Sequence, residues 1–271
     1  MRLLSRGHGV SRPTRLPDGI AIRGPARLYV RNSLDDSYEV PVLPETTAVT
    51  MASKRLSRLR GRIGLCFVAL LSMIAGMTDA IGFVVTGDFV SFMSGNTTRL
   101  AVSIGAANHA LAIHICMLIA AFVVGNAAGV FAARLARRRA WPLLMTIGVL
   151  LSVCAINDAA PAAFILAVLA MGMINAVVEE VNGLPIGLTY VTGALSRFGR
   201  GLGRWLLGER RNGWRVQLIP WGGMLIGAIA GGLLAQSFGI KAMAVSGVST
   251  LLLAALSAGI PRSWQLSFMP R

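Results

Sequence analysis

The sequence carries the stretch Ser91-Phe-Met-Ser-Gly-Asn-Thr-Thr-Arg-Leu100, and a second stretch, Thr189-Tyr-Val-Thr-Gly-Ala-Leu-Ser-Arg-Phe198, aligns with it without a gap. Both run hydroxyl, aromatic, apolar, hydroxyl, Gly, two variable positions, hydroxyl, Arg and apolar, and we call them the paired motif. The flanking sequences repeat in the same order. Before the two copies stand Gly76-Met-Thr-Asp-Ala80 and Gly172-Met-Ile-Asn-Ala176, and after them Gly125-Asn-Ala-Ala-Gly129 and Gly227-Ala-Ile-Ala-Gly231. These landmarks indicate an internal duplication.

The composition is that of an integral membrane protein. Hydrophobic residues make up 55% of the 271 positions, charged residues make up 14%, and the mean hydropathy is +0.66. Soluble domains carry about 25% charged residues. An apolar helix of about 20 residues crosses a hydrocarbon core of about 30 Å. We expect spans near 63–85, 108–133, 141–157, 161–181, 216–237 and 240–260. The runs are continuous, unlike the alternating strands of a membrane barrel.

The net charge of +15 gathers in clusters just beyond these spans, at Lys54–Arg62, Arg134–Arg139, Arg197–Arg215, and Arg262 with Arg271. Lys and Arg near span ends are typical of cytoplasmic loops, where they also attract anionic lipid headgroups. No separate basic domain with interleaved aromatic residues exists to bind nucleic acid. The lipid bilayer is therefore the expected partner, and nucleic acid is not.

The same charges predict the topology. If both copies of the paired motif crossed the membrane, Arg134–Arg139 would lie outside. If the motif segments, about 88–105 and 184–200, do not cross, every basic cluster and both termini are cytoplasmic. Each repeat then has three spans, an odd number, so the second repeat is inverted. We expect an all-α membrane protein with six transmembrane helices in two inverted three-helix repeats, each with a re-entrant or broken helix that lines a central cavity.

On this interpretation the chain has five parts. Residues 1–50 are scattered with Arg, Pro and Gly and lack the apolar segment of a signal peptide. We expect them to form a disordered basic tail, or to precede a true start at Met51. The remaining parts are a basic cytoplasmic flank at 51–62, a first membrane repeat at 63–158, a second at 159–261 and a cytoplasmic tail at 262–271.

Polar residues among the apolar segments mark a candidate solute site. A carboxylate inside a span costs several kcal/mol unless it is paired, protonated or solvated. Asp79 is therefore either a functional group or the acceptor of a structural hydrogen bond, and the matched Asn175 has its shape without its charge. Ser94-Gly-Asn-Thr-Thr98 either caps a helix or presents a helix N-terminus to an anionic or polar solute. Arg99 and Arg197 either complete this site or reach the headgroups. The candidate substrate-binding residues are Asp79, Ser94, Asn96, Thr97, Arg99, Asn175, Tyr190, Thr192 and Arg197.

No motif predicts a metal, a cofactor or a catalytic site. Cys66, Cys116 and Cys154 fall in three different spans without paired spacing, and no CxxC pair is present. His109 and His114 are five apart and do not stack on one helix face, so ordinary interfacial roles are favoured over ligation or proton relay. A catalytic serine context and a phosphate loop are also missing. We expect no enzyme activity.

Three blocks of the sequence read Phe-Met-Ser-Gly-Asn-Thr-Thr-Arg at 92–99, Ala-Met-Gly-Met-Ile-Asn-Ala at 170–176 and Thr-Tyr-Val-Thr-Gly-Ala-Leu-Ser-Arg at 189–197. Over about residues 60–260 the chain resembles the YoaK-like family of bacterial inner-membrane proteins. Members usually carry Gln where this chain has Ile174, and Thr-Gly-Thr where it has Thr-Gly-Ala194. The resemblance implies a multi-pass protein of the bacterial inner membrane and no particular substrate, because the family is functionally uncharacterised.

Two classes of function stay open. The first is a small-solute transporter in which the repeats rock about a midplane site, with an ion channel as a close variant. The second is a non-transporting membrane scaffold that binds a partner through its loops. Glycines four residues apart in 125–129 and 227–231 predict close helix packing, within the chain or in a homo-oligomer.

Overall fold

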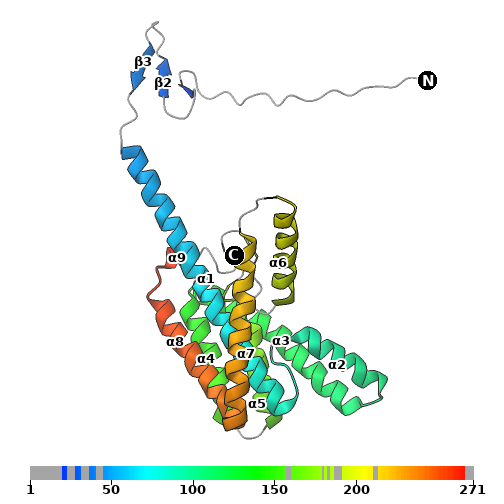
Figure 1. Ribbon diagram of the computed structural model, residues 1–271. Coiled ribbons are helices and arrows are strands. Elements are labelled where there is room, and N and C mark those ends of the chain that lie inside the picture. The colour runs from blue at the N-terminus through cyan, green and yellow to red at the C-terminus, as the bar shows by residue number, and fades with distance from the viewer. Residues whose placement is uncertain are drawn as a thin grey trace, which may run out of the picture. The chain divides into compact units, whose positions relative to one another are not determined.

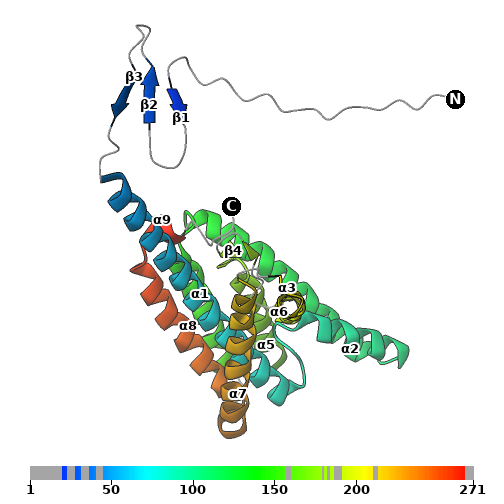
Figure 2. The ribbon, with the colours of Figure 1, turned by 45° about the horizontal axis from the view of Figure 1, so that its top comes forward.

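The computed structural model describes the backbone of residues 20–22, 28–31, 37–40, 45–156, 160–178, 180–181, 184–185, 191–209 and 213–265. The chain divides into two compact units, Met1–Arg58 and Leu59–Arg271. The first unit holds an antiparallel sheet of β1 (Ile20–Ile22), β2 (Leu28–Arg31) and β3 (Ser37–Val40) in that order (Figure 2). Many of residues 1–50 fall outside the described ranges, so the expectation of a disordered tail or a start at Met51 stays a prediction.

The second unit is built from helices (Figure 1). Helix α1 (Glu45–Thr86) runs into it from the first unit and is followed by helices that account for most of the described residues. They are α2 (Met93–Gly105), α3 (His109–Leu135), α4 (Ala140–Ile156), α5 (Ala160–Ile174), α6 (Val191–Leu206), α7 (Leu218–Phe238), α8 (Met243–Ala258) and α9 (Arg262–Gln265). The 3-10 turns η1 (Trp214–Gln217) and η2 (Gly239–Ala242) flank α7, and β4 (Glu180–Val181) pairs with β5 (Leu184–Pro185).

Three helical stretches among the described residues are long and apolar enough to cross a membrane: Gly61–Thr86, His109–Leu135 and Trp214–Ala258. Ala140–Ile156 and Phe164–Ile174 are shorter apolar helices. A straight helix of the 45 residues in the third stretch would measure about 68 Å, about twice the hydrocarbon thickness. The chain instead reverses at Gly239, whose φ of +55° suits glycine, and α8 leads away from this turn in a direction opposite to that of α7 (Figures 1 and 2).

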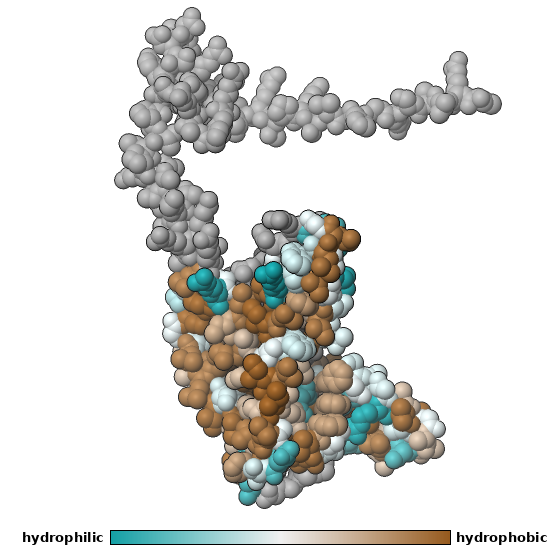
Figure 3. Space-filling view, viewed as in Figure 1, coloured by the Kyte–Doolittle hydropathy of each residue, from teal (hydrophilic) through white to brown (hydrophobic). Residues whose placement is uncertain are grey.

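The surface of this unit is apolar in the manner of a membrane protein. Figure 3 shows brown, hydrophobic residues over most of the visible bundle. On α3, α7 and α8, apolar side chains that are more than half exposed include Val123, Phe131, Ile226, Leu233, Leu252 and Leu256. A soluble protein rarely exposes so large an apolar surface, whereas lipid chains cover it without cost. The composition and the exposed side chains thus agree that this is a helical membrane protein.

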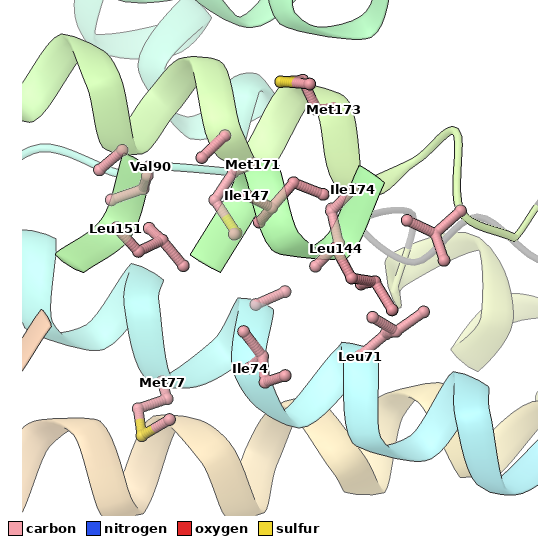
Figure 4. Close-up of a cluster of buried hydrophobic side chains, with 14 of the residues drawn as sticks. Leu71, Ile74, Met77, Val90, Leu144, Ile147, Leu151, Met171, Met173 and Ile174 are labelled. Atoms are coloured by element: carbon pink, nitrogen blue, oxygen red, sulfur yellow. The ribbon is translucent and has the colours of Figure 1, made fainter. Parts of the chain in front are cut away.

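The core lies where α1, α4 and α5 meet (Figure 4). Leu71 and Ile74 of α1 point toward Leu144 and Ile147 of α4, and Met171 of α5 lies beside them. All five are at most 2% exposed. The core thus joins α1, which precedes the first motif copy, to α5, which precedes the second.

Close glycine contacts pair α7 with α1. A Cβ added to Gly223, Gly227 or Gly231 of α7 would collide with the carbonyl oxygen of Ala69, Met73 or Met77 of α1, respectively. The residue numbers increase in the same direction along both helices, so α7 and α1 are parallel. The small residues allow the backbones to approach.

The equivalent contact pairs α3 with α5. A Cβ on Gly125 of α3 would collide with the Leu169 carbonyl oxygen, and one on Gly129 would lie 3.0 Å from Met173. These helices are also parallel. The predicted close packing of the two Gly-x-x-x-Gly segments is confirmed within the chain, while an oligomer through these helices stays a prediction that the single chain does not test.

Helices α4 and α8 pack against each other in the opposite sense. Gly148 of α4 lies against Leu251 and Gly247 of α8, and Gly247 lies against Gly148 and Ser152 of α4. The residue numbers run in opposite directions along the contact, so these two helices are antiparallel.

Candidate functional site

The first copy of the paired motif begins with a loop that folds back along α1. Helix α1 ends at Thr86, and Gly87 has a φ of +76° that allows the chain to turn. Asp79 lies seven residues before the end of α1, about 10 Å along the helix. Its Oδ1 accepts hydrogen bonds from the backbone N–H groups of Val90 and Ser91, both at 2.7 Å, and its Oδ2 accepts one from Ser91 Oγ at 2.6 Å. The chain therefore re-enters the helix bundle to the depth of Asp79.

Asn96 also holds this loop, through hydrogen bonds to the backbone of Phe89. Its Nδ2 donates to the Phe89 carbonyl at 2.7 Å, its Oδ1 accepts from the Phe89 N–H at 3.3 Å, and the side chain is fully buried. Asn96 stands in the first turns of α2, so α2 starts where Asp79 holds the loop. Asp79 and Asn96 together fix the start of a short helix inside the bundle.

A cavity of about 320 Å³ opens beside this loop. Its described lining comes from α1, from the loop, from the first turn of α6 and from α7. The lining residues are Gly76, Asp79, Ala80, Phe83, Phe89, Phe92, Val191, Thr192, Met224 and Ala228. The second copy of the paired motif, which supplies Val191 and Thr192, thus meets the first copy at one cavity.

Three phenylalanines form the aromatic side of the cavity. The rings of Phe83 and Phe89 stack with centroids 4.8 Å apart and an interplanar angle of 11°. The rings of Phe89 and Phe92 meet edge to face at 5.1 Å and 86°. Both arrangements are favourable for aromatic pairs, so the rings brace one another and hold the wall in place.

The matched arginines have partners away from the cavity lining. Arg99 of α2 forms an ion pair with Asp88, whose other oxygen lies 2.8 Å from Nε2 of His114 in α3. Asp88 is only 4% exposed. Arg197 of α6 donates from Nε to Oε1 of Gln217 at 2.9 Å. The structure therefore places both arginines in contacts between the motif helices and their neighbours.

Sequence reasoning missed the cluster of Asp88, Arg99 and His114. A signal was available, because Asp88 is the only acidic residue between Asp79 and Asp158, and Arg99, His109 and His114 follow it. A buried carboxylate needs a partner, and these were the nearest basic side chains along the chain.

The other candidate residues are scattered. Ser94 and Thr97 are exposed on α2, and Thr97 Oγ1 donates to the Met93 carbonyl of its own helix at 2.8 Å. Asn175 is half-buried in the turn after α5, and Tyr190 lies outside the described residues. Of the nine predicted site residues, the described cavity lining includes Asp79 and Thr192.

The chain is similar to proteins of a family whose function is unknown. A family model described as "Protein of unknown function (DUF1275)" matches residues 67–256. The UPF0700 transmembrane protein RA0705 of Rhizobium meliloti (strain 1021) is 47% identical over 215 residues, which cover 79% of this chain and 95% of that protein. No solved structure matches.

Proposed function

This chain belongs to the DUF1275 family of proteins of unknown function, and we propose that it is a small-solute transporter of the bacterial inner membrane. The match confirms the predicted membership of an uncharacterised family of membrane proteins. The relative's name includes the words "transmembrane protein", in agreement with the apolar helices found here.

The observation that carries the proposal is the shared cavity. Phe92, directly before α2, and Val191 and Thr192, at the start of α6, line the same space. Short helices that begin inside a bundle and face a common cavity are typical of secondary transporters, whose solute sites lie near the bilayer midplane. Broken backbone at that depth is tolerated where it lines such a cavity.

The helix pairing supports two inverted repeats, α1 to α4 and α5 to α8, with six spans. The α3–α5 contact matches the α7–α1 contact, because each joins the Gly-x-x-x-Gly helix of one repeat to the first helix of the other. The last helices, α4 and α8, pair with each other and are antiparallel. A two-fold axis in the membrane plane relates equivalent helices in this antiparallel way, whereas an axis along the membrane normal would make them parallel.

The same contacts define the moving parts. Glycine contacts hold α1 to α7 and α3 to α5, so a motion of one whole repeat against the other would break both interfaces. We therefore assign alternating access to a smaller movement beside the cavity, of the motif helix α6 and the helix α7 on which it packs.

The test is uptake into proteoliposomes. Solutes are first found with a thermal-shift screen of the purified protein against metabolites and ions, and uptake of each hit is then measured. Ala228→Trp fills the cavity and should abolish both the shift and the uptake. Ala120→Trp, at an exposed position of α3, is the matched control and should preserve both. Binding without uptake in the wild type would refute transport and favour a binding protein.

A further inference from the structure

The cavity combines one carboxylate with an aromatic and aliphatic wall. Of its described lining residues, Asp79 is the only ionisable one and Thr192 the only other with a polar side chain. The nearest basic residue of the first motif copy, Arg99, is paired with Asp88. The charge of Asp79 therefore meets no basic side chain among the described residues that line the cavity.

The loop binds Asp79 without supplying an opposite charge. The N–H groups of Val90 and Ser91 donate to Oδ1, Ser91 Oγ donates to Oδ2, and the N–H group of Phe92 also donates to the carboxylate. All of these donors are neutral, so an ionised Asp79 keeps its negative charge at a position that lines the cavity. A substituted ammonium group is attracted to this charge without needing a free hydrogen-bond position.

The start of α2 disfavours an anionic solute. Of the N–H groups in its first turn, which an anion would use, those of Met93, Gly95 and Asn96 already donate to the carbonyl oxygens of Ser91 and Phe92. An anion placed beside them would face a carboxylate in a poorly hydrated site, where repulsion between like charges is strong.

The three phenylalanines favour an organic cation over a metal ion. A cation over the face of an aromatic ring is attracted by the ring quadrupole. Metal ions such as Mg²⁺ and Ca²⁺ instead need about six oxygen ligands, and Asp79 and Thr192 supply few. A volume of about 320 Å³ accommodates a small organic molecule.

We propose that the cavity binds a monovalent organic cation with an apolar body, such as an alkyl- or arylammonium ion. The cationic head pairs with the carboxylate of Asp79, and the apolar substituents lie against Phe83, Phe89 and Phe92. This inference rests on the proposed function, since it names the solute class of that same cavity.

The test uses a charged probe and its neutral isostere. Full-length protein is placed in nanodiscs, and equilibrium dialysis measures the binding of radiolabelled phenyltrimethylammonium after subtraction of binding to protein-free nanodiscs. We expect saturable binding, with tert-butylbenzene displacing the probe at least about tenfold less well than unlabelled phenyltrimethylammonium, because the isostere lacks the charge.

Two variants locate the site. Asp79→Asn keeps the shape and an oxygen acceptor for the loop, and should weaken probe binding about tenfold. Phe83 is 50% exposed, so Phe83→Leu leaves the core intact even if the Asp79 variant fails to fold, and should weaken binding several-fold. Phe131→Leu is the control, because Phe131 is 70% exposed on α3 and outside the lining. It should bind as the wild type does.

The outcomes separate this inference from the proposed function. Equal displacement by tert-butylbenzene, or unchanged binding in the variants that fold, would overturn the cation site and leave an apolar pocket. Absence of saturable probe binding by folded protein would overturn it as well. Probe binding without uptake into proteoliposomes would support the cation site and refute transport. Uptake of a neutral or anionic solute without probe binding would support transport and overturn the cation site.

Discussion

Asp79 shows how one residue can be structural and still line a site. Its three hydrogen bonds to Val90 and Ser91 hold the re-entrant loop, which is the structural role left open by the sequence, and the same side chain lines the cavity. The two roles are compatible because the donors of the loop are neutral, so an ionised Asp79 keeps its negative charge beside the cavity. The sequence-matched Asn175 is not among the described lining residues, so the ionisable group of the described lining comes from Asp79 alone.

Removal of the Asp79 acceptor should destabilise the loop. In Asp79→Ala, three donors of the loop lose their acceptor, and at about 1 kcal/mol each the free energy of unfolding should fall by about 3 kcal/mol. Asp79→Asn should lose less, because its Oδ1 still accepts from backbone N–H groups. Denaturant unfolding in detergent measures both values. Equal losses in the two variants would contradict this account of the loop.

The Asp88 cluster makes a second residue-level prediction. Asp88 contacts Arg99 of α2 and His114 of α3, so it ties the motif helix to the next span. A double-mutant cycle of Asp88→Asn and Arg99→Ala should give a coupling free energy of about 1 kcal/mol, since Arg99 is partly exposed and its charge is partly screened. The same cycle with Arg200→Ala, at an exposed arginine of α6, should give none.

At the level of elements, α9 joins two helix ends. Gln265 of this short helix donates from Nε2 to the carbonyl oxygens of Ser257 and Ile260, both at 2.9 Å, after the last turns of α8. Its Oε1 accepts from the N–H of Ala140, the first residue of α4, at 2.8 Å. A single side chain thus bonds backbone groups both where α8 ends and where α4 begins, and it supplies an acceptor for the Ala140 N–H group at the start of α4.

Loss of the Gln265 side chain should therefore cost more than its size suggests. Gln265→Ala leaves a buried N–H group without its acceptor and two carbonyl groups without this donor, so we expect the free energy of unfolding to fall by about 2–3 kcal/mol. Gln236→Ala, at an exposed position of α7, should change it by less than about 0.5 kcal/mol. Thermal unfolding in detergent compares the two, and similar midpoints would rule out this role for Gln265.

The α1–α7 contact gives a prediction with a built-in control. Leucine at Gly227 would collide with the α1 backbone, whereas Gly232 of the same helix has open space where a Cβ would lie. We expect Gly227→Leu to lower the free energy of unfolding by about 3 kcal/mol or more and to abolish uptake, because the α1 backbone must move. Gly232→Leu should be stable and active. Wild-type behaviour of both variants would show that α1 and α7 do not pack as described.

The sequence predicted the bounds of the helices better than it predicted which helices pack against each other. The expected spans 108–133 and 216–237 correspond to α3 (His109–Leu135) and α7 (Leu218–Phe238), because hydrophobicity alone sets their length. The span expected to reach residue 181 ends as a helix at Ile174, since Val177 and Val178 are buried in a non-helical stretch that hydropathy cannot distinguish from helix.

The candidate site was predicted in part. The repeated motif predicted that both copies lie near one cavity, and Asp79 and Thr192 are among the predicted residues that line it. The sequence could not assign Asn96 to the Phe89 backbone or Arg99 to Asp88, because those contacts depend on a loop that reverses direction. A Gly-x-x-x-Gly segment likewise indicates a close contact without naming the helix on the other side.

For the whole molecule, the proposed topology places the α2–α3 turn outside the cell and the α6–α7 loop inside. We predict that Ala106→Cys is labelled by an impermeant maleimide in intact cells, and that Glu209→Cys is labelled after the membrane is opened. Both positions are exposed. The background lacks Cys66, Cys116 and Cys154. Labelling of both cysteines from the same side would refute the inverted arrangement.

The contact between α1 and α7, which lie far apart in the sequence, has a consequence for biosynthesis. Helix α1 ends at Thr86 and its partner α7 begins at Leu218, so the ribosome adds about 130 residues before the two can meet. At about 5–20 residues per second, α1 waits on the order of ten seconds. Throughout that interval its packing face is open to lipid and to any other nascent chain. The α1 helix of one chain can then pack against α7 of another chain. Strong over-expression should therefore yield domain-swapped dimers that slower synthesis avoids.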